Sequence, residues 1–258
     1  MPPNKLTAAL LIVLWLFGCS APAGRRTEAS TVAQAPRAAA APHGAADYRI
    51  DSARSELRVL VFRAGPMAFL GHDHVILNRA LAGWVDPGAG IGSSSFHLEI
   101  PVAEFAVDDA AARLSEGPDF AEEIADDAKR GTQHNMLGEA LLDAQEFPMI
   151  VVRSISVEGS EPALTATVSI SAAGHESTQV LPFTLVRTAT QLTARADFGL
   201  AQSSLGLTPI SVMMGALRVQ DEIRVKIELV ASSRSGGIES GGIGKRRDDD
   251  WGPLGSDE

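Results

Sequence analysis

The stretch IRVKIEL, from Ile223 to Leu229, decides the fold class because apolar and charged residues alternate in it without a break. A period of two puts the apolar residues on one face of a strand and the charged residues on the other. The same alternation occurs in FHLEI (96–100), LTATVSI (164–170) and LTARADFGL (192–200). Because each stretch has one apolar and one polar face, the pattern predicts half-buried antiparallel strands rather than a parallel sheet.

About eight such strands between Tyr48 and Ala231 must bury their apolar faces together, and a sheet that closes on itself does so without leaving exposed edges. The expected fold is therefore all-β, an extended antiparallel β-barrel of about eight strands. The segment from Glu104 to Gly138 lacks the alternation and is rich in Ala, Asp and Glu. It is expected to form short helices across one end of the barrel, broken at Gly117-Pro118 and at Gly131.

Residues 1–19 have the pattern of a lipoprotein signal peptide, since Lys5 precedes the apolar run LTAALLIVLWLFG and Cys19 follows that run. Cys19 is the only cysteine of the chain, so no disulfide can form within it. The residues LFGC (16–19) resemble a bacterial lipobox, in which the cysteine is acylated and becomes the first residue. This resemblance predicts lipid attachment at Cys19 and a periplasmic, lipid-anchored location in the bacterial cell envelope, with Ser20 favouring the outer membrane.

The remaining boundaries follow from composition. Residues 20–46 consist almost wholly of small, polar and charged residues, which predicts a disordered tether. Residues 47–231 form the expected barrel domain, and residues 232–258 have the composition of a disordered C-terminal tail.

The formal net charge of −10 argues against nucleic acid as a partner, because binding to phosphates requires a basic surface. Nine of the acidic residues lie between Glu104 and Asp127, against a single base, Arg113. We interpret this segment as a solvated acidic surface. The sequence leaves the oligomeric state open and is compatible with a dimer.

Four blocks of sequence resemble the YceI-like, polyisoprenoid-binding family in their order and spacing. They are YRIDSARSELRVLVF (48–62), GHDHVI (71–76), GTQHNMLGEALLDAQEFPMIVVRSISV (131–157) and PISVMMGALRVQDEIRVKIELVA (209–231). The second block resembles the branch of the family that carries Gly-His-Asp-His. Together the blocks cover nearly all of the expected barrel domain.

The resemblance implies a lipocalin-like barrel that holds an isoprenoid or other amphiphilic lipid in its lumen. No Gly-x-Ser-x-Gly, Gly-rich phosphate loop or Cys-x-x-Cys-His motif occurs in the sequence, so we expect a binding protein without catalysis and without a cofactor. An isoprenoid or quinone-like lipid is the expected ligand. The candidate wall residues are large apolar side chains expected to face inward: Phe62, Phe69, Trp84, Phe183, Phe198 and Leu205.

The motif GHDHVIL (71–77) places His72 and His74 on one face of an extended segment, with Asp73 on the other. One interpretation is a zinc or copper site, although a closed site requires three or four ligands. A second is a hydrolytic site, and a third is purely structural histidines. We favour a fourth interpretation, a polar mouth formed by His72 and His74, where a quinone or phosphate oxygen of a lipid headgroup is bound.

Overall fold

The computed structural model describes residues 48–233 of the chain. The predicted signal peptide with Cys19, the tether and most of the predicted tail lie outside these residues. None of the helices in the described part is long and apolar enough to cross a membrane.

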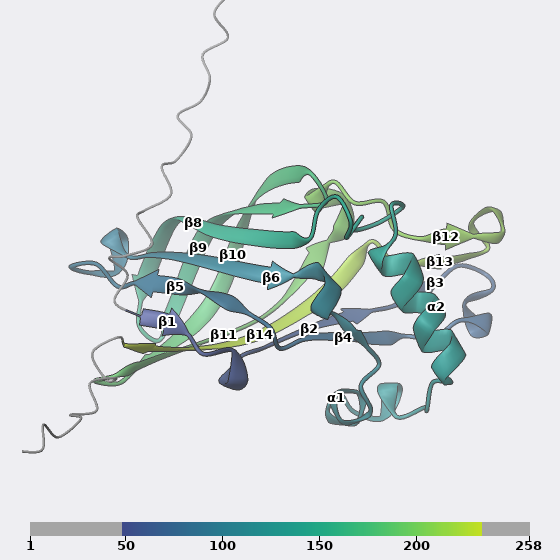
Figure 1. The fold of residues 1–258 in the computed structure, drawn as a ribbon, viewed down its shortest axis with the longest axis horizontal. Coiled ribbons are helices and arrows are strands. Elements are labelled where there is room, and N and C mark those ends of the chain that lie inside the picture. The colour runs from purple at the N-terminus through teal and green to yellow at the C-terminus, as the bar shows by residue number, and fades with distance from the viewer. Residues whose placement is uncertain (1–47, 234–258) are drawn as a thin grey trace, which may run out of the picture. The chain divides into compact units, whose positions relative to one another are not determined.

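Most of the described chain forms one large antiparallel sheet (Figure 1). Its strands are β1 (Tyr48–Ile50), β2 (Glu56–Val61), β4 (His74–Asn78), β5 (Ala82–Asp86), β6 (Ser95–Pro101), β7 (Ala106–Val107), β8 (Met149–Ser160), β9 (Ala163–Ala172), β10 (His175–Arg187), β11 (Gln191–Ala201) and β14 (Glu222–Ser233). A small second sheet contains β3 (Arg63–Ala64), β12 (Ser211–Val212) and β13 (Leu217–Val219).

Helices and single turns connect these strands. The two α-helices are α1 (Ala110–Ser115) and α2 (Asp126–Leu137). The 3₁₀ turns are η1 (Ser52–Arg54), η2 (Ala68–Leu70), η3 (Ile91–Ser93), η4 (Val102–Glu104), η5 (Pro118–Phe120), η6 (Gln202–Leu205) and η7 (Met213–Gly215).

The main sheet closes into a barrel because β14 pairs with β1 as well as with β2 and β11. β1 and β2 lie along β14 one after the other and act as one strand interrupted by η1. β4 and β5 continue each other in the same way. The result is a closed, eight-stranded antiparallel barrel, as the alternation predicts.

Strand β4 is buried on both faces, unlike most strands of the barrel. His74 and Ile76 line the interior. Val75 and Leu77 point the other way and pack in a cluster with Ala112 of α1 and Phe120 of η5. A strand that is covered on both sides has apolar residues at successive positions, because both of its faces are buried. This accounts for the sequence Val-Ile-Leu that follows His74.

Glu116, directly after α1, fixes this helix to the outside of the barrel. Its buried carboxylate accepts a hydrogen bond from Arg58 of β2 at 3.0 Å and one from Lys226 of β14. Burial alone would raise the pKa of Glu116, but these two cations hold it below its ordinary value. The carboxylate therefore stays charged and connects α1 to two neighbouring strands.

Two boundaries differ from expectation. Gly131 lies inside α2 and does not end it. A glycine within a helix costs about 1 kcal/mol relative to alanine, and burial of Met136 in the core offsets that cost. Ser232 and Ser233, expected in the tail, pair with Arg49 and Tyr48 and so extend β14 beyond Ala231.

Gly83 in β5 provides a test of the barrel's close packing. Its φ is +146°, and an added Cβ would lie 2.0 Å from the carbonyl oxygen of His97 in β6. Gly83→Ala should therefore lower the free energy of unfolding by about 2 to 3 kcal/mol in urea titrations.

Gly92→Ala is the matched control, because an added Cβ there meets no atom within 4 Å. Its effect should stay within about 0.5 kcal/mol. Equal effects of the two substitutions would contradict the packing described for β5 and β6.

Candidate functional site

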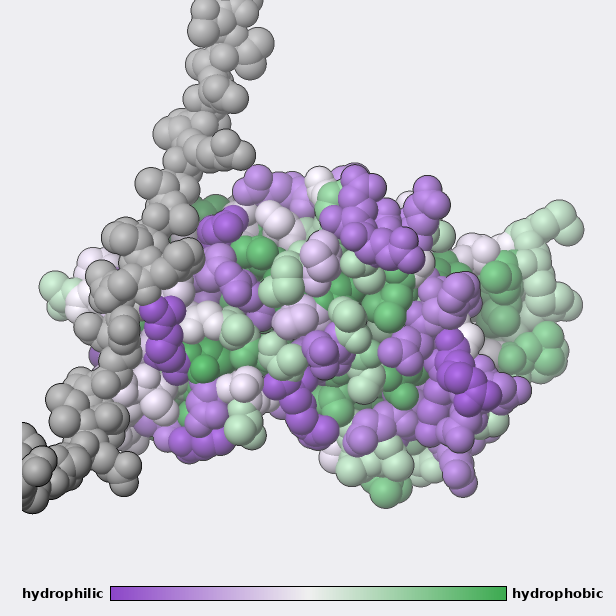
Figure 2. Space-filling model, in the orientation of Figure 1, coloured by the Kyte–Doolittle hydropathy of each residue, from purple (hydrophilic) through white to green (hydrophobic). Residues whose placement is uncertain are grey.

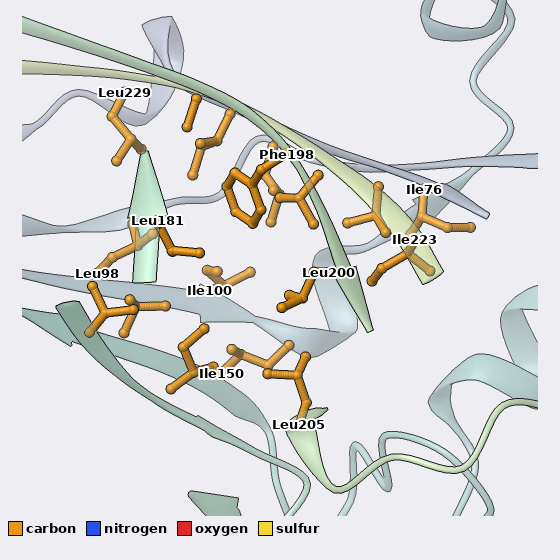
Figure 3. A pocket seen from close by; sticks show the side chains of 18 of the residues that line it. Ile76, Leu98, Ile100, Ile150, Leu181, Phe198, Leu200, Leu205, Ile223 and Leu229 are labelled. Carbon is orange, nitrogen blue, oxygen red and sulfur yellow. The ribbon is translucent and has the colours of Figure 1, made fainter. Parts of the chain in front are cut away.

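The interior of the barrel contains a cavity of about 510 Å³. Ligand pockets in proteins span roughly 300 to 1,000 Å³. Every second residue of β14 from Ile223 to Ala231 lines the cavity, and eight residue steps of about 3.3 Å give it a length of about 26 Å. Leucine, isoleucine and phenylalanine side chains from strands on all sides point into the same space (Figure 3). The cavity is therefore long and walled by hydrocarbon.

Most of the side chains expected at the site do line the cavity. Phe183, Phe198 and Leu205 contribute to the apolar wall. Phe62 borders the cavity at its rim, but its ring packs on Phe120 in the cluster outside β4, so the expectation that it faces inward was wrong. His72 and His74 lie at the end of the barrel where β4 begins, and both contribute to the lining. The shared side of the two imidazoles agrees with their predicted extended spacing.

The other two expected wall residues, Phe69 and Trp84, do not line the cavity. Phe69 lies in η2 and is 75% exposed to solvent. Trp84 is buried, but it lies on the face of β5 opposite to Val85, and Val85 lines the cavity. The Trp84 ring stacks on His97 at a centroid distance of 6.0 Å. The expectation was wrong for Trp84 because Gly83 and the short strand gave no clear phase to the alternation.

Asp108, between β7 and α1, positions the imidazole of His74. Its Oδ2 lies 2.6 Å from His74 Nδ1, and its Oδ1 accepts a hydrogen bond of 2.9 Å from the backbone N–H of Val75. An ionised carboxylate can only accept, so the imidazole Nδ1 carries the proton and donates it. His74 Nε2 then faces the cavity as an acceptor, 3.4 Å from the hydroxyl of Thr132 in α2.

Arg113 of α1 balances the charge of Asp108. Its Nη1 donates to Asp108 Oδ1 at 2.6 Å and to the backbone carbonyl of Asp73 at 2.8 Å. Both side chains are almost fully buried. A buried carboxylate with an arginine and two further donors is well satisfied, so the group fixes the geometry of the segment around His74.

The pKa of Asp108 is lowered in the folded protein. Burial is the largest influence and by itself would raise this pKa, but the hydrogen bonds from His74, from the Val75 N–H and from Arg113 outweigh it. Asp108 is therefore ionised at neutral pH, which keeps His74 in a single orientation.

His72 supplies the second imidazole of the polar mouth. The rings of His72 and His74 lie 6.4 Å apart, nearly perpendicular to each other. His72 Nδ1 is shielded from solvent and makes no hydrogen bond to any described residue. Asp73 points away from the cavity and accepts the backbone N–H of Arg63 at 2.8 Å. Glu122 Oε2 lies 3.9 Å from His72 Nδ1, beyond hydrogen-bond distance. His72 Nδ1 is therefore a buried atom beside a carboxylate and is not exposed to the lumen.

Asp108 and Arg113 were missed because they lie within the acidic run from Glu104 to Asp127. That run is not a uniformly solvated surface, since Asp108 is only 1% exposed and Arg113 is buried with it. One signal was present in the sequence: a single arginine among nine acidic residues. A lone base in such a run is a candidate for a specific ion pair.

The metal alternative for His72 and His74 requires further ligands nearby. Within residues 48–233, no group of three or more His, Cys, Asp or Glu side chains is arranged to hold a metal ion. The arrangement that the structure does contain is a carboxylate-oriented imidazole at the end of a hydrocarbon-lined cavity.

Asp108→Asn tests the role assigned to this buried carboxylate. At pH 7 the substitution should lower the free energy of unfolding by about 3 to 5 kcal/mol, because it leaves Arg113 buried without a counter-charge. A carboxyl group whose pKa is lowered by folding stabilises the protein above its unfolded-state pKa of about 4 and loses that effect as the pH falls through the folded-state value. Between pH 5 and 2, wild type should therefore lose more stability than the variant does.

Asp126→Asn, at a carboxylate that is 83% exposed, is the control for urea titrations over the same pH range. It should leave the pH dependence close to that of wild type. Parallel curves for wild type and Asp108→Asn would contradict the ionised state of Asp108.

Comparison with known proteins agrees with this architecture. The barrel is similar to that of BcnA from Burkholderia cenocepacia, with a TM-score of 0.50 and 17% identity over 70% of this chain and 98% of that one. It is also similar to a polyisoprenoid-binding domain from Saccharophagus degradans implicated in plant cell wall breakdown, with a TM-score of 0.50 and 9% identity over 73% and 99%. At these identities the likeness concerns the fold alone. No curated protein sequence matches the chain.

The sequence itself is more specific than these structural likenesses. The YceI-like domain model matches residues 48–231, which include all of the barrel strands except the last two residues of β14. The chain therefore belongs to the YceI-like domain family.

Proposed function

We propose that this protein is a binding protein that holds an isoprenoid-type or other amphiphilic lipid in the lumen of its barrel, without catalysing a reaction. The observation that carries the proposal is the combination of a long apolar cavity with imidazoles at one end. Membership of the YceI-like family supports it, as does the polyisoprenoid-binding description of the Saccharophagus degradans domain.

The apolar wall supplies the driving force for binding. Each methylene moved from water into a hydrocarbon environment contributes about 0.8 kcal/mol. Burial of a chain of about 20 carbons is favourable by roughly 10 kcal/mol or more, before the costs of ordering and association. A cavity walled by aliphatic and aromatic side chains therefore selects ligands with a long apolar part.

The polar mouth, with its Gly-His-Asp-His motif, binds the headgroup in this proposal. His74 Nε2 is an oriented acceptor, Thr132 carries a hydroxyl beside it, and His72 contributes to the same lining. A hydroxyl of the ligand can donate to His74 Nε2, and the Thr132 hydroxyl can donate to a quinone or phosphate oxygen. These contacts fix the orientation of the lipid, with its head at the β4 end of the barrel and its chain along β14.

We further propose that Cys19 carries the lipid anchor and that the barrel works on the periplasmic face of the bacterial envelope. The lipobox-like LFGC and the sole cysteine support this location. Cys19→Ser should abolish incorporation of a fatty-acid analogue and leave the leader uncleaved, and labelling equal to wild type would exclude the anchor.

Ala194→Trp tests binding in the lumen, because Ala194 lines the cavity and an indole there takes space that a lipid chain requires. The full chain is loaded with the fluorophore N-phenyl-1-naphthylamine, and geranylgeraniol is titrated in to displace it. The substitution should weaken the binding of geranylgeraniol by more than about tenfold, because the indole occupies the space in which the lipid chain would contact the wall. Circular dichroism checks that the variant is folded, and Ala196→Trp, also in the lining, serves as a second lumen variant.

Val180→Trp is the matched control, because Val180 is exposed on β10 and a tryptophan there adds the same bulk outside the cavity. His72→Gln/His74→Gln keeps hydrogen-bonding groups and should weaken geranylgeraniol only modestly. If the double glutamine variant lost all binding while both lumen tryptophan variants kept it, the histidines and not the lumen would be the site. Zinc binding that only the glutamine variant lost would favour the metal alternative.

A further inference from the structure

Exposed hydrophobic side chains gather at one end of the barrel. Within the described residues, five of the nine exposed large hydrophobic side chains come from only two short segments, at η2 and at β12–η7. These five side chains, here called the apolar tip, are Phe69, Leu70, Val212, Met213 and Met214. In the space-filling view, hydrophobic residues are seen together at the end of the molecule where β12 and β13 lie (Figure 2).

The two segments are held together by backbone hydrogen bonds. β13 pairs with β3, and the N–H of Met67 donates to the carbonyl of Ala216 at 2.9 Å. Gly65 passes so close to Ala216 that a Cβ would lie 2.5 Å from its carbonyl oxygen. The apolar tip is therefore one built surface and not two independent loops.

The backbone of the tip keeps its methionines in solvent. Met213 and Met214 have φ values of +52° and +53°, in the left-handed region that disfavours residues other than glycine. Met214 is fully exposed. Both the conformation and the exposed apolar surface cost free energy in the isolated protein, and such costs are typical of surfaces that function by binding.

The charge around the tip differs from that of the whole chain. Segments 62–72 and 206–220 contain two arginines, Arg63 and Arg218, and no acidic residue, whereas the chain has a net charge of −10. Arg218 is exposed on β13, one strand behind the methionines. Asp73, directly after the first segment, pairs with Arg63, whose Nε lies 3.9 Å from its Oδ1, so Arg218 is the cation of these segments without a carboxylate partner among residues 48–233. Asp221 directly follows the second segment. Exposed methionine and phenylalanine side chains with arginine behind them are typical of surfaces that insert into a bilayer with anionic headgroups.

The tip also borders the cavity. Val212 of the tip lines it, as do Gly71, Ile210 and Leu217 beside the tip. β1, through which the N-terminal part of the chain joins the barrel, pairs with the far end of β14. The end that carries the tip is thus opposite to the end at which β1 begins (Figure 1).

We propose that the apolar tip inserts into the surface of a lipid bilayer containing anionic lipids. Insertion covers the exposed methionines and Phe69 with acyl chains and brings Arg218 to the headgroups. It also sets the rim of the cavity against the bilayer, so that an apolar chain moves between them with little contact with water. The docking itself does not depend on which ligand the lumen holds.

The test uses the full chain with Phe69→Trp, mixed with vesicles of phosphatidylglycerol and phosphatidylcholine whose acyl chains carry bromine. Bromine quenches tryptophan only at close range. The fluorescence emission of the tryptophan at position 69 is obtained by subtracting the emission of wild type. This emission should be at least twofold lower with brominated vesicles than with plain vesicles. Val180→Trp is the matched control for an exposed aliphatic position on the barrel wall, and its emission should not change. Adding Met214→Asp to Phe69→Trp should remove the quenching.

Two results would overturn the proposal. One is equal emission of the Phe69→Trp variant with brominated and with plain vesicles. The other is sedimentation of wild type as a dimer that Met214→Asp converts to a monomer, which would assign the tip to contact between copies of the chain. The Met214→Asp substitution that removes the quenching should leave displacement by geranylgeraniol unchanged. Membrane docking and binding in the lumen are therefore tested separately.

Discussion

The pairing of β1 with the C-terminal end of β14 closes the sheet, and the other features of the molecule depend on that closure. Once the sheet is closed, every alternating strand turns one side chain in two toward a shared interior. These side chains are apolar, and they leave a cavity of about 510 Å³ between them. An interior of this kind excludes polar solutes and favours a long apolar guest, so the simple period of two in the sequence leads directly to the chemistry of the site.

Against this hydrocarbon interior, one buried polar group determines how the mouth is arranged. Asp108 connects β4 to the segment before α1 through the Val75 N–H, and it holds His74 and Arg113 at the same time. Such a group is costly to bury and is retained only when its partners are complete. α1 in turn is held on the barrel by Glu116 with Arg58 and Lys226. The position of the imidazole at the mouth therefore depends on the outer helix as well as on the strand.

Local periodicity predicted the closed barrel, the inward faces of β6, β9, β11 and β14, and the shared side of His72 and His74, because these depend on near neighbours in sequence. It failed where the decisive contact comes from far along the chain. Asp108 meets His74 across 34 residues and lay within an acidic run, so its burial left no periodic trace. Trp84 lies in a five-residue strand beside Gly83, where alternation has little to fix its phase. Phe69 was expected in the wall from its size alone, but η2 turns it outward.

Native mass spectrometry of the full chain, purified from bacterial membranes in mild detergent, shows whether the lumen holds a lipid. Wild type should carry a bound mass of several hundred daltons that fragments as a lipid, and Ala194→Trp prepared in the same way should lack it. A bound mass equal to a single transition-metal ion, or a lipid retained equally by wild type and Ala194→Trp, would contradict the claim that the lumen is the binding site.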